Sequence, residues 1–432
     1  MMLPSDSNAW IYTRLKEGET VYQFYKEHRF NTVWLKDGAS AMADSMFLFL
    51  KNVRLYGLLP QDYHITEIEN LEASPKGIIT FYRKDALLTD AFLSLAMDLK
   101  YGRLDSNLKP NKVDSLTLQI LDFALVSQEI KKTLESQEPS YPEYQFLKKS
   151  LHEMLNSTDS TDRNMLFSGV TYDSIILHKK VQYIEINMER WRNEVVPLEN
   201  RYIWINIPSY QLQVVDKGQT ILESRIIVGK PETRSPVLSS LVECITLYPY
   251  WHVPRKIAIE EFLPVIQSDT SFLTLNKFDV LDRKGTVLDP DSLDWKKYNK
   301  NYFPFSLRQR EGKENSLGLI KFVFDNPYAV FLHDTNAKGL FSKKTRALSH
   351  GCIRMEKAVE LVKYLVPAPD KIDQQLDEKE RRTINLSNPI PIHIRYLTCE
   401  HTGGVLIFFD DIYQQDQNII QLLYHHSEVA VY

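Results

Sequence analysis

The hydrophobic period of the chain changes near Arg201, and this change constrains the fold more than any other feature. Before it, apolar residues recur every three or four positions, as in 177–191, which is typical of amphipathic helices. After it, β-branched and aromatic runs such as 202–207 and 221–228 predict strands. Helices followed by strands in one chain indicate an α+β protein whose helical and β parts are separate domains.

The same patterns give approximate element positions. Helical spacing predicts helices at 40–57 with Ser40 as N-cap, 89–102, from about 116, 144–154 and 177–191. Strand patterns predict strands at 202–207, 211–215, 221–228, 319–324, 329–332, 392–397 and 405–409. Residues 255 to about 305 mix Pro, Asp, Lys and aromatic residues around a turn, and we interpret them as an inserted lid.

A chain of 432 residues is too long for one typical core, so two domains are expected. We expect a helical scaffold domain at 30–195, a mainly-β domain with the insertion at 196–415, and a C-terminal tail at 416–432. The Ser/Thr/Asp-rich stretch 156–162 is the linker candidate, because few of its residues suit a core.

Composition excludes several classes of protein and partner. A formal net charge of −4 provides no basic footprint for nucleic acid, so none is expected as a partner. No apolar run reaches the roughly 18 residues that a membrane helix needs, so no membrane span is expected. Residues 1–10 show no basic region followed by an apolar region, so no signal peptide is expected there.

Of the three cysteines, Cys352 has the most reactive context. Cys244 and Cys399 lie in apolar strand-like runs, where a buried free thiol is commoner than a disulfide bridge. Cys352 precedes a predicted helix with an apolar stripe, and helix-start amides together with Arg354 would stabilise its thiolate. His333 ends a predicted strand and is the candidate base of a Cys–His pair.

Backbone amides around Gly351 and Cys352 are candidates for an oxyanion hole, because glycine permits close approach and helix-start amides lack partners. The simpler alternative is that a lone Cys or His is structural. His425 and His426 lack a spaced set of further ligands, so no metal site is expected.

The hexapeptide Ser349–Arg354, with His333 nineteen positions before Cys352, resembles the signature of L,D-transpeptidases with a YkuD-type catalytic domain. Further similarity runs through 228–236, 249–254, 307–322 and 410–413, and in the first half through 57–64 and 88–105. The chain therefore resembles the large multidomain branch over most of 35–413. The stretch 156–172 is too short for the separate peptidoglycan-binding module that many members carry.

This resemblance implies a peptidoglycan L,D-transpeptidase that forms 3–3 cross-links between stem peptides through a cysteine thioester. It implies a tetrapeptide donor, a diamino-acid acceptor, carbapenem β-lactams as inhibitors, no cofactor or metal, and a periplasmic or cell-envelope location. Its implied site has Cys352 and His333 as catalytic residues, Ser349, His350 and Gly351 in support, and Arg354, Trp251, Tyr248 and Phe331 against the substrate.

Two other hypotheses about function are compatible with the sequence. The same Cys–His dyad serves an L,D-carboxypeptidase or an enzyme that exchanges the terminal D-amino acid, and the sequence does not rank acceptors. A member of another class would be a wall-binding scaffold whose catalytic domain is silent. A papain-like protease is disfavoured, because its cysteine comes early and its histidine far downstream, the reverse of the order here.

Overall fold

The computed structural model describes residues 12, 14–35, 41–75, 77–104, 115–157, 172–194 and 199–424, without the side chains of 157 and 172–177. Ser40, most of the predicted linker, His425 and His426 lie outside the described residues. The chain divides into two compact units, 1–195 with 397–432, and 196–396. Each unit is described by itself.

The first unit is mainly helical. Its helices are α1 (Gly18–Glu27), α2 (Ala41–Lys51), η2 (Val53–Tyr56), η3 (Pro60–Tyr63), α3 (Ile65–Ala73), α4 (Ile78–Tyr101), α5 (Ser115–Ser127), α6 (Ile130–Glu135), α7 (Pro142–Ser157), α9 (Tyr172–Arg192) and α15 (Asp416–Tyr424). A hairpin, β14 (Cys399–Thr402) and β15 (Val405–Phe408), is grouped with these helices rather than with the β-rich unit. The predicted strand at 405–409 is therefore present, in the helical unit.

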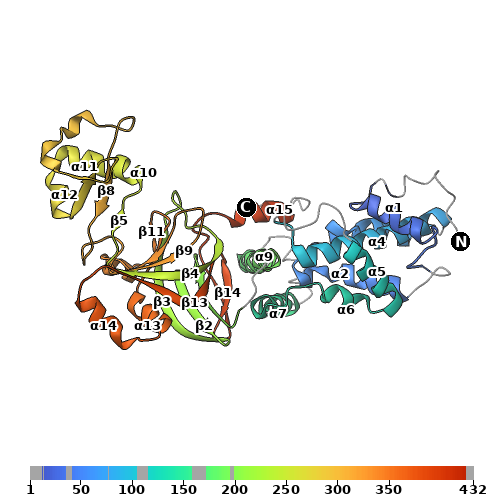
Figure 1. Ribbon diagram of the computed structural model, residues 1–432. Helices are drawn as coiled ribbons and strands as arrows, with labels where there is room; N and C mark the ends of the chain where they lie inside the picture. The colour runs from blue at the N-terminus through green and yellow to red at the C-terminus, as the bar shows by residue number, and fades with distance from the viewer. Residues whose placement is uncertain are drawn as a thin grey trace. The chain divides into compact units, whose positions relative to one another are not determined.

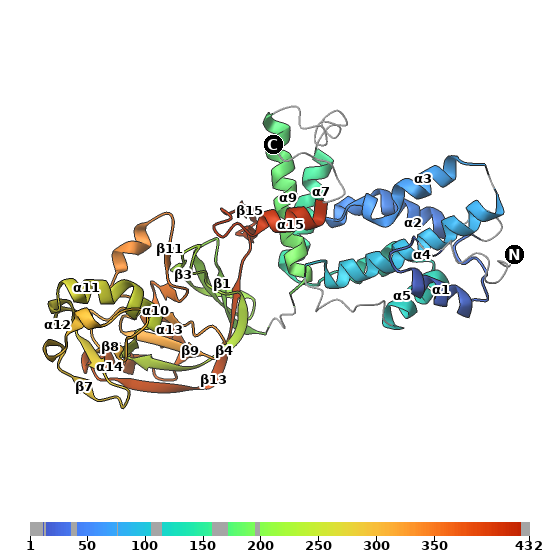
Figure 2. The same cartoon turned by 90° about the horizontal axis from the view of Figure 1, so that it is seen from above.

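Helix α4 is the centre of this unit, with α1, α2, α3, α5 and α6 all in contact with it (Figure 2). Its residues are buried almost without interruption from Tyr82 to Leu99. The predicted helix at 89–102 is confirmed, but α4 begins at Ile78, before the predicted start. Its first turn is exposed at Ile78 and Ile79, so no core-facing apolar stripe marks where the helix starts.

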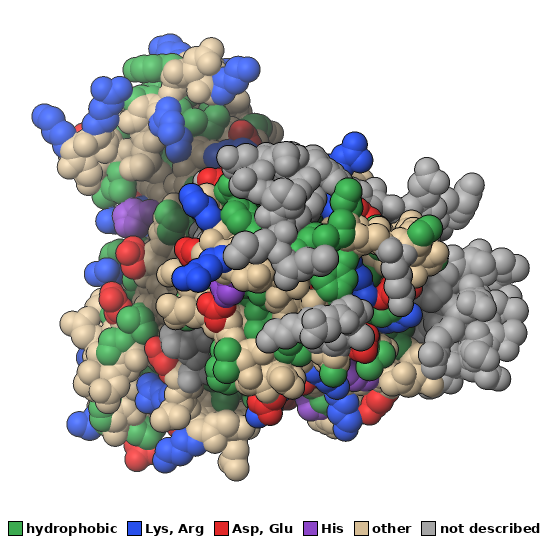
Figure 3. Space-filling model, turned by 90° about the vertical axis from the view of Figure 1, so that its right-hand side faces the viewer, with side chains coloured by type: hydrophobic (Ala, Val, Ile, Leu, Met, Phe, Trp, Pro, Cys, Tyr) green, Lys and Arg blue, Asp and Glu red, His purple; other side chains and the backbone are tan. Residues whose placement is uncertain are grey.

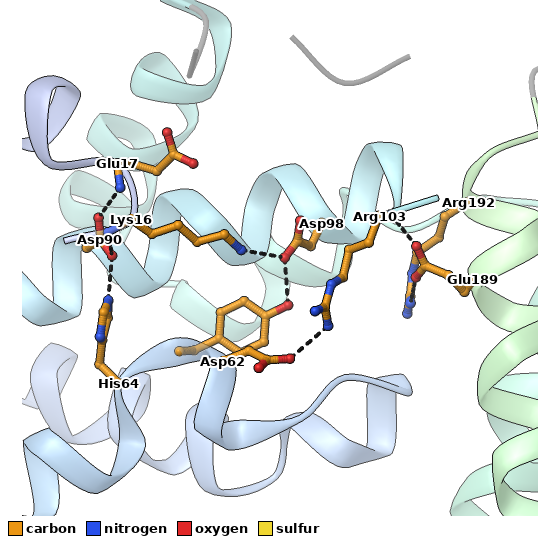
Figure 4. Close-up of polar contacts among 10 residues, drawn as sticks. Lys16, Glu17, Asp62, His64, Asp90, Asp98, Arg103, Glu189 and Arg192 are labelled. Carbon is orange, nitrogen blue, oxygen red and sulfur yellow. Dashed lines mark hydrogen bonds and ion pairs between the residues drawn. The ribbon is translucent and has the colours of Figure 1, made fainter. Parts of the chain in front are cut away.

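Two buried aspartates of α4 connect it to its neighbours (Figure 4). The Asp90 carboxylate accepts backbone N–H groups of Lys16 at 3.1 Å and Glu17 at 2.7 Å, and it pairs with His64 Nε2. One oxygen of Asp98, Oδ2, accepts from both the Lys16 ammonium at 3.2 Å and the Tyr63 hydroxyl at 2.9 Å. These bonds satisfy buried charges and anchor the segment that enters α1.

We expect Asp90→Ala to lower the free energy of unfolding of the helical unit by about 3 kcal/mol, because two backbone N–H groups lose their acceptor and His64 loses its partner. Urea unfolding followed by circular dichroism at 222 nm measures this change. The control is Glu69→Ala, which removes an exposed α3 carboxylate and should cost less than about 1 kcal/mol. Equal effects of the two variants would contradict a structural role for Asp90.

The second unit is built on a nine-stranded sheet (Figure 1). In chain order its strands are β1 (Arg201–Asn206), β2 (Gln211–Asp216), β3 (Gln219–Gly229), β4 (Leu238–Leu247), β9 (Ile320–Phe324), β10 (Leu332–His333), β11 (Ala347–Ser349), β12 (Ile353–Met355) and β13 (Arg382–Arg395). The spatial order is β11-β3-β12-β10-β9-β4-β13-β1-β2, and β2 also pairs with β3. The sheet therefore closes on itself, which leaves few open strand edges.

Helices and a small subdomain complete this unit. Helices η7 (Lys338–Ser342), α13 (Ala358–Leu365) and α14 (Asp370–Asp377) lie in its second half, and the insertion holds β5 (Trp251–His252), α10 (Arg255–Ile257), the π-helix η4 (Ala258–Phe262), α11 (Leu263–Ser268), α12 (Ser271–Leu275), β6 (Phe278–Leu281), β7 (Val287–Leu288), η5 (Pro290–Ser292), η6 (Trp295–Lys297) and β8 (Ser306–Gln309). Strands β5, β8, β6 and β7 form a separate sheet over a core that includes Ile266, Val280 and Leu307.

Three sequence predictions differ from the structure. The helix predicted just after Cys352 is present as α13, with Ala358, Val362 and Leu365 buried, but its predicted start is wrong, because β12 lies between the cysteine and this helix. The predicted strand 392–397 is the end of a longer strand, β13, which has a register shift between Asn385 and Ile390. The predicted strand at 329–332 is only two residues long, Leu332–His333.

The described surface fits the composition. On the face that Figure 3 shows, Lys and Arg side chains occur among Asp and Glu, in keeping with the small formal net charge. Among the helices of the described residues, none has the length and apolar character that crossing a bilayer requires.

Candidate active site

His333 and Cys352 are brought together by two neighbouring parallel strands. Strand β10 pairs with β12 so that Leu332 lies opposite Ile353 and His333 opposite Arg354. Cys352 immediately precedes β12, and the next amide, Ile353 N–H, donates to the carbonyl of Phe331 at 2.9 Å. Because side chains alternate along a strand, Cys352 and His333 leave the same face of the sheet.

His333 is buried, with 4% of its surface exposed, and its ring has a defined tautomer. Its Nδ1 lies within hydrogen-bonding distance of the Asp334 carbonyl, which can only accept. Nδ1 therefore carries the proton of the neutral ring, and Nε2 is the nitrogen that can take another. Asp334 is itself held, since its carboxylate accepts the Leu319 N–H at 2.9 Å and pairs with Lys338.

Residue 318 must be a glycine, because the Asp334 side chain lies against it. Gly318 has a φ of +64°, and a Cβ added there would meet the Asp334 carboxylate oxygen at 2.4 Å. A side chain at this position would therefore displace the residue that follows His333.

The loop before Cys352 is rigidly bonded to β3 and the turn after it. The carbonyl of buried Ser349 accepts from Lys230 N–H at 2.9 Å and from the Thr233 hydroxyl at 3.0 Å. Its own hydroxyl donates to the Cys352 carbonyl and accepts the Gly351 N–H at 3.2 Å. Gly351 has a φ of +109°, a conformation that L side chains rarely adopt.

A second serine completes this loop. The Ser235 hydroxyl donates to the Gly351 carbonyl at 2.7 Å and accepts the Gly229 N–H at 2.9 Å. The backbone on either side of the cysteine is therefore fixed before any ligand arrives, which is the condition for a preorganised site.

Burial and two cations set the protonation of the pair. Burial lowers the pKa of His333 to about 3, and Arg354 and Lys321 add to the effect, while hydrogen bonds with the backbone at Asp334 and Leu317 oppose it. Burial raises the pKa of the Cys352 thiol above its ordinary value of 9.0, although a backbone bond at Phe331, Lys321 and Arg354 act in the other direction.

At neutral pH the site therefore holds a neutral thiol and a neutral imidazole. The expectation that helix-start amides and Arg354 make Cys352 a resting thiolate is wrong in its net effect. No helix starts at Cys352, and burial outweighs the two cations. The proton on sulfur must move as attack occurs, with His333 Nε2 available to receive it.

The other predicted site residues fall into two groups. Arg354 and Phe331 stay with the pair, since Arg354 lies opposite His333 and Phe331 precedes Leu332 in β10. The hydroxyl of Tyr248 donates to the Leu376 carbonyl at 2.6 Å, and the Tyr248 residue is buried. Trp251 packs on Phe262 and Phe278 in the insertion. Tyr248 and Trp251 are thus engaged in packing.

His350 also turns away from the loop that it belongs to. Its Nε2 lies 2.7 Å from the Glu261 carboxylate of η4, and both side chains are partly exposed. This contact connects the cysteine loop with the insertion.

Sequence reasoning did not single out Lys321 or Ser235 by role. Lys321 lies opposite His333 on β9, and its signal was a charged residue inside the otherwise apolar run Ile320–Phe324. Ser235 was part of the resemblance at 228–236, but only the folded chain brings its hydroxyl to Gly351.

The remaining cysteines and potential metal ligands are accounted for. Cys244, Cys352 and Cys399 are all free thiols. Within the described residues, no group of three or more His, Cys, Asp or Glu side chains is arranged to hold a metal.

Comparison with known proteins agrees with this division of the chain. A family model described as a scaffold domain matches residues 19–151, and one described as an L,D-transpeptidase catalytic domain, YkuD, matches 200–373. A protein of Haemophilus influenzae named "Putative L,D-transpeptidase" is 35% identical over 242 residues, 55% of this chain and 49% of that protein. The chain thus matches about half the length of this relative.

Solved structures show weak overall similarity. The L,D-transpeptidase from Mycobacterium smegmatis is 14% identical over 45% of this chain and 58% of that chain, with a TM-score of 0.22. The catalytic domain of the Enterococcus faecium L,D-transpeptidase acylated by ertapenem is 14% identical over 46% of this chain and 100% of that chain, also with a TM-score of 0.22.

The β-rich unit is thus a YkuD-type L,D-transpeptidase catalytic domain. The chain thus joins a region that matches a scaffold domain to one that matches this catalytic domain, and this match supports an enzyme.

We expect alkylation of Cys352 by iodoacetamide to accelerate with pH through a midpoint above 9.0, because only the thiolate reacts and burial raises the pKa of this thiol. Peptide mapping by mass spectrometry, with initial rates at each pH, follows Cys352 separately from the other two cysteines. A midpoint near 7 would show that the resting site holds a thiolate and would contradict the neutral pair.

Proposed function

We propose that this protein is a peptidoglycan L,D-transpeptidase that forms 3–3 cross-links between stem peptides through a thioester on Cys352. The observation that carries the proposal is the parallel register of β10 and β12, which puts His333 and Cys352 on one face beside a rigid, glycine-containing loop. Membership of the family supports the type of reaction.

The first step acylates the enzyme. The Cys352 sulfur attacks the carbonyl of the third residue of a tetrapeptide donor, and its proton passes to His333 Nε2. The Cys352 backbone amide stabilises the oxyanion that forms, because the Gly351 N–H already donates to the Ser349 hydroxyl. The bond to the fourth residue then breaks, and the leaving amine takes the proton from His333, so that D-alanine departs and a thioester remains.

The second step transfers the acyl group. The side-chain amine of the diamino acid in an acceptor stem attacks the thioester carbonyl and gives its proton to His333. Collapse of the adduct releases the cross-linked product, and the proton returns to the Cys352 sulfur. The insertion that includes η4 limits the access of competing water to the thioester.

The partners follow from the reaction. A donor tetrapeptide and an acceptor diamino acid are found in the cell wall, so we place the protein in the cell envelope, in the periplasm where an outer membrane is present. Carbapenem β-lactams are proposed inhibitors, because the strained amide of the ring acylates a nucleophilic thiol and leaves a stable adduct.

Two other activities differ from this one in the products that they form. Water as acceptor makes the enzyme an L,D-carboxypeptidase, and a free D-amino acid as acceptor makes it an exchange enzyme. A scaffold with a silent catalytic domain produces none of these products, and the complete bonding around Ser349 and Gly351 speaks against it.

Incubation with a carbapenem should add one drug mass to the wild-type chain and none to Cys352→Ala, as measured by intact mass. Cys244→Ala is the control, since it removes another free thiol and should react like the wild type. An adduct that persists in Cys352→Ala would assign the nucleophile elsewhere. No adduct on the wild type would favour the silent scaffold.

Purified disaccharide-tetrapeptides should be converted to 3–3 linked dimers, as shown by mass spectrometry with fragmentation of the cross-link. Tripeptides without dimers would instead establish the carboxypeptidase. Substitution of the terminal residue in the presence of a D-amino acid would establish the exchange enzyme.

Substitutions at Ser349 and at His350 should change the rate of acylation to different extents. We expect Ser349→Ala to slow carbapenem acylation about tenfold, because Gly351 N–H and the Cys352 carbonyl lose a buried partner. His350→Ala should change the rate less than about threefold, because its contact with Glu261 is partly exposed. Stopped-flow fluorescence or timed intact-mass sampling measures both, and a larger effect of His350 would overturn this order.

A further inference from the structure

Three neighbouring strands carry a row of basic side chains across the candidate active site. His333 on β10 is paired with Lys321 on β9 and with Arg354 on β12. Residues that are directly paired point to the same face, and adjacent strands lie about 4.8 Å apart. The imidazole therefore lies between two cations, and both of them act on the pKa values of His333 and Cys352.

Lys321 is a half-buried ammonium group without an acidic partner. Its Nζ lies 3.4 Å from the centroid of the Phe331 ring, which directs it toward the start of β10. Within the described residues, no Asp or Glu is placed within ion-pairing distance of it. Burial lowers the pKa of Lys321 and Arg381 adds to this effect, while Cys352 and Cys244 oppose it. A cation–π contact offsets only part of the cost of burying this charge.

Arg354 presents the same incomplete bonding on the other side of His333. Its Nε is buried and has no hydrogen-bond partner. Burial lowers the pKa of Arg354, with Cys352 the group that opposes the effect. The face around His333 and Cys352 is therefore positively charged, with few anions to balance it. In a structural ion pair the cation is already neutralised, whereas a site for an anionic ligand leaves its cations to the ligand.

The order of the strands gives a direction to the reaction. Cys352 lies on the β12 side of His333 and Lys321 on the β9 side. The leaving amine takes its proton from His333, so the leaving residue lies beside His333. In an amino acid the α-carboxylate is two bonds from the amine nitrogen. Lys321 is one strand beyond His333, and its ammonium group lies over the Phe331 ring beside Cys352, so this cation is the neighbour that faces the carboxylate of the leaving residue.

We propose that Lys321 is a specificity-determining residue that binds the α-carboxylate of the amino acid leaving the acyl donor. This assignment rests on the proposed acyl transfer at Cys352. The assignment explains why the half-buried Lys321 lies beside His333 although no acidic side chain among the described residues balances its charge. A donor whose last residue ends in a carboxylate completes the charge balance of the site, and a donor that ends in an amide does not.

The test is equilibrium binding of synthetic stem tetrapeptides to full-length Cys352→Ala protein, so that no turnover is needed. Isothermal titration calorimetry compares a donor with a free C-terminal carboxylate and the same peptide with a C-terminal carboxamide. We expect the carboxylate peptide to bind at least tenfold more tightly. Lys321→Met in this background should remove that preference, and Lys321→Arg should keep most of it.

Two controls separate a binding role from a general one. Lys371→Met removes one exposed cation of α14 and should leave the preference unchanged. The second control is a peptide that is amidated only at the side-chain carboxylate of its third residue. The ratio of its affinities for Cys352→Ala protein without and with Lys321→Met should equal that of the parent peptide. Thermal unfolding of Lys321→Met confirms that the variant is folded.

The outcomes differ from those of the functional test. Equal binding of carboxylate and carboxamide peptides, or a preference that survives Lys321→Met, overturns the assignment. If Lys321→Met instead changes the affinity for the parent peptide relative to the side-chain amidated peptide, the assignment is also overturned. Lys321 would then bind the side-chain carboxylate of the third residue. A Lys321-dependent preference in a protein that makes no dimers supports the carboxylate site and rejects the transpeptidase.

Discussion

The parallel pairing of β10 with β12 is the contact on which the candidate site depends. It joins two very short strands, held between β9 and β3 in a sheet that closes on itself. The pairing sets His333 opposite Arg354 and places Cys352 one residue before the strand. A shift of one residue would turn these side chains to the other face, so the closed sheet is what fixes the proposed dyad.

Burial then decides the chemistry of the pair. A thiol and an imidazole in a partly desolvated site are both driven to their neutral forms, even beside Lys321 and Arg354. A nucleophile of this kind is activated by proton transfer during attack rather than by a standing thiolate. The uncompensated cations are then available to an anionic ligand, which links the protonation of the pair to recognition of the donor.

The insertion and the helical unit each have a core of their own. The insertion packs its aromatic residues around Phe262 and Phe278, and it meets the cysteine loop through Glu261 and His350. The helical unit is organised around α4, whose buried Asp90 and Asp98 bond to backbone N–H groups, His64, Lys16 and Tyr63. Each part is thus stable through its own burial, and the site belongs to the β-rich unit.

The sequence by itself determined the α+β class, most helices of the first half and the segment that holds Cys352 and His333, because periodicity and a short motif are local properties. It did not determine that β12 rather than a helix follows Cys352, since three residues of strand carry too little pattern. Only the tertiary structure decided the neutral state of the pair, the packing roles of Tyr248 and Trp251, and the place of Lys321. Burial and register depend on residues far apart in the chain, which no local pattern records.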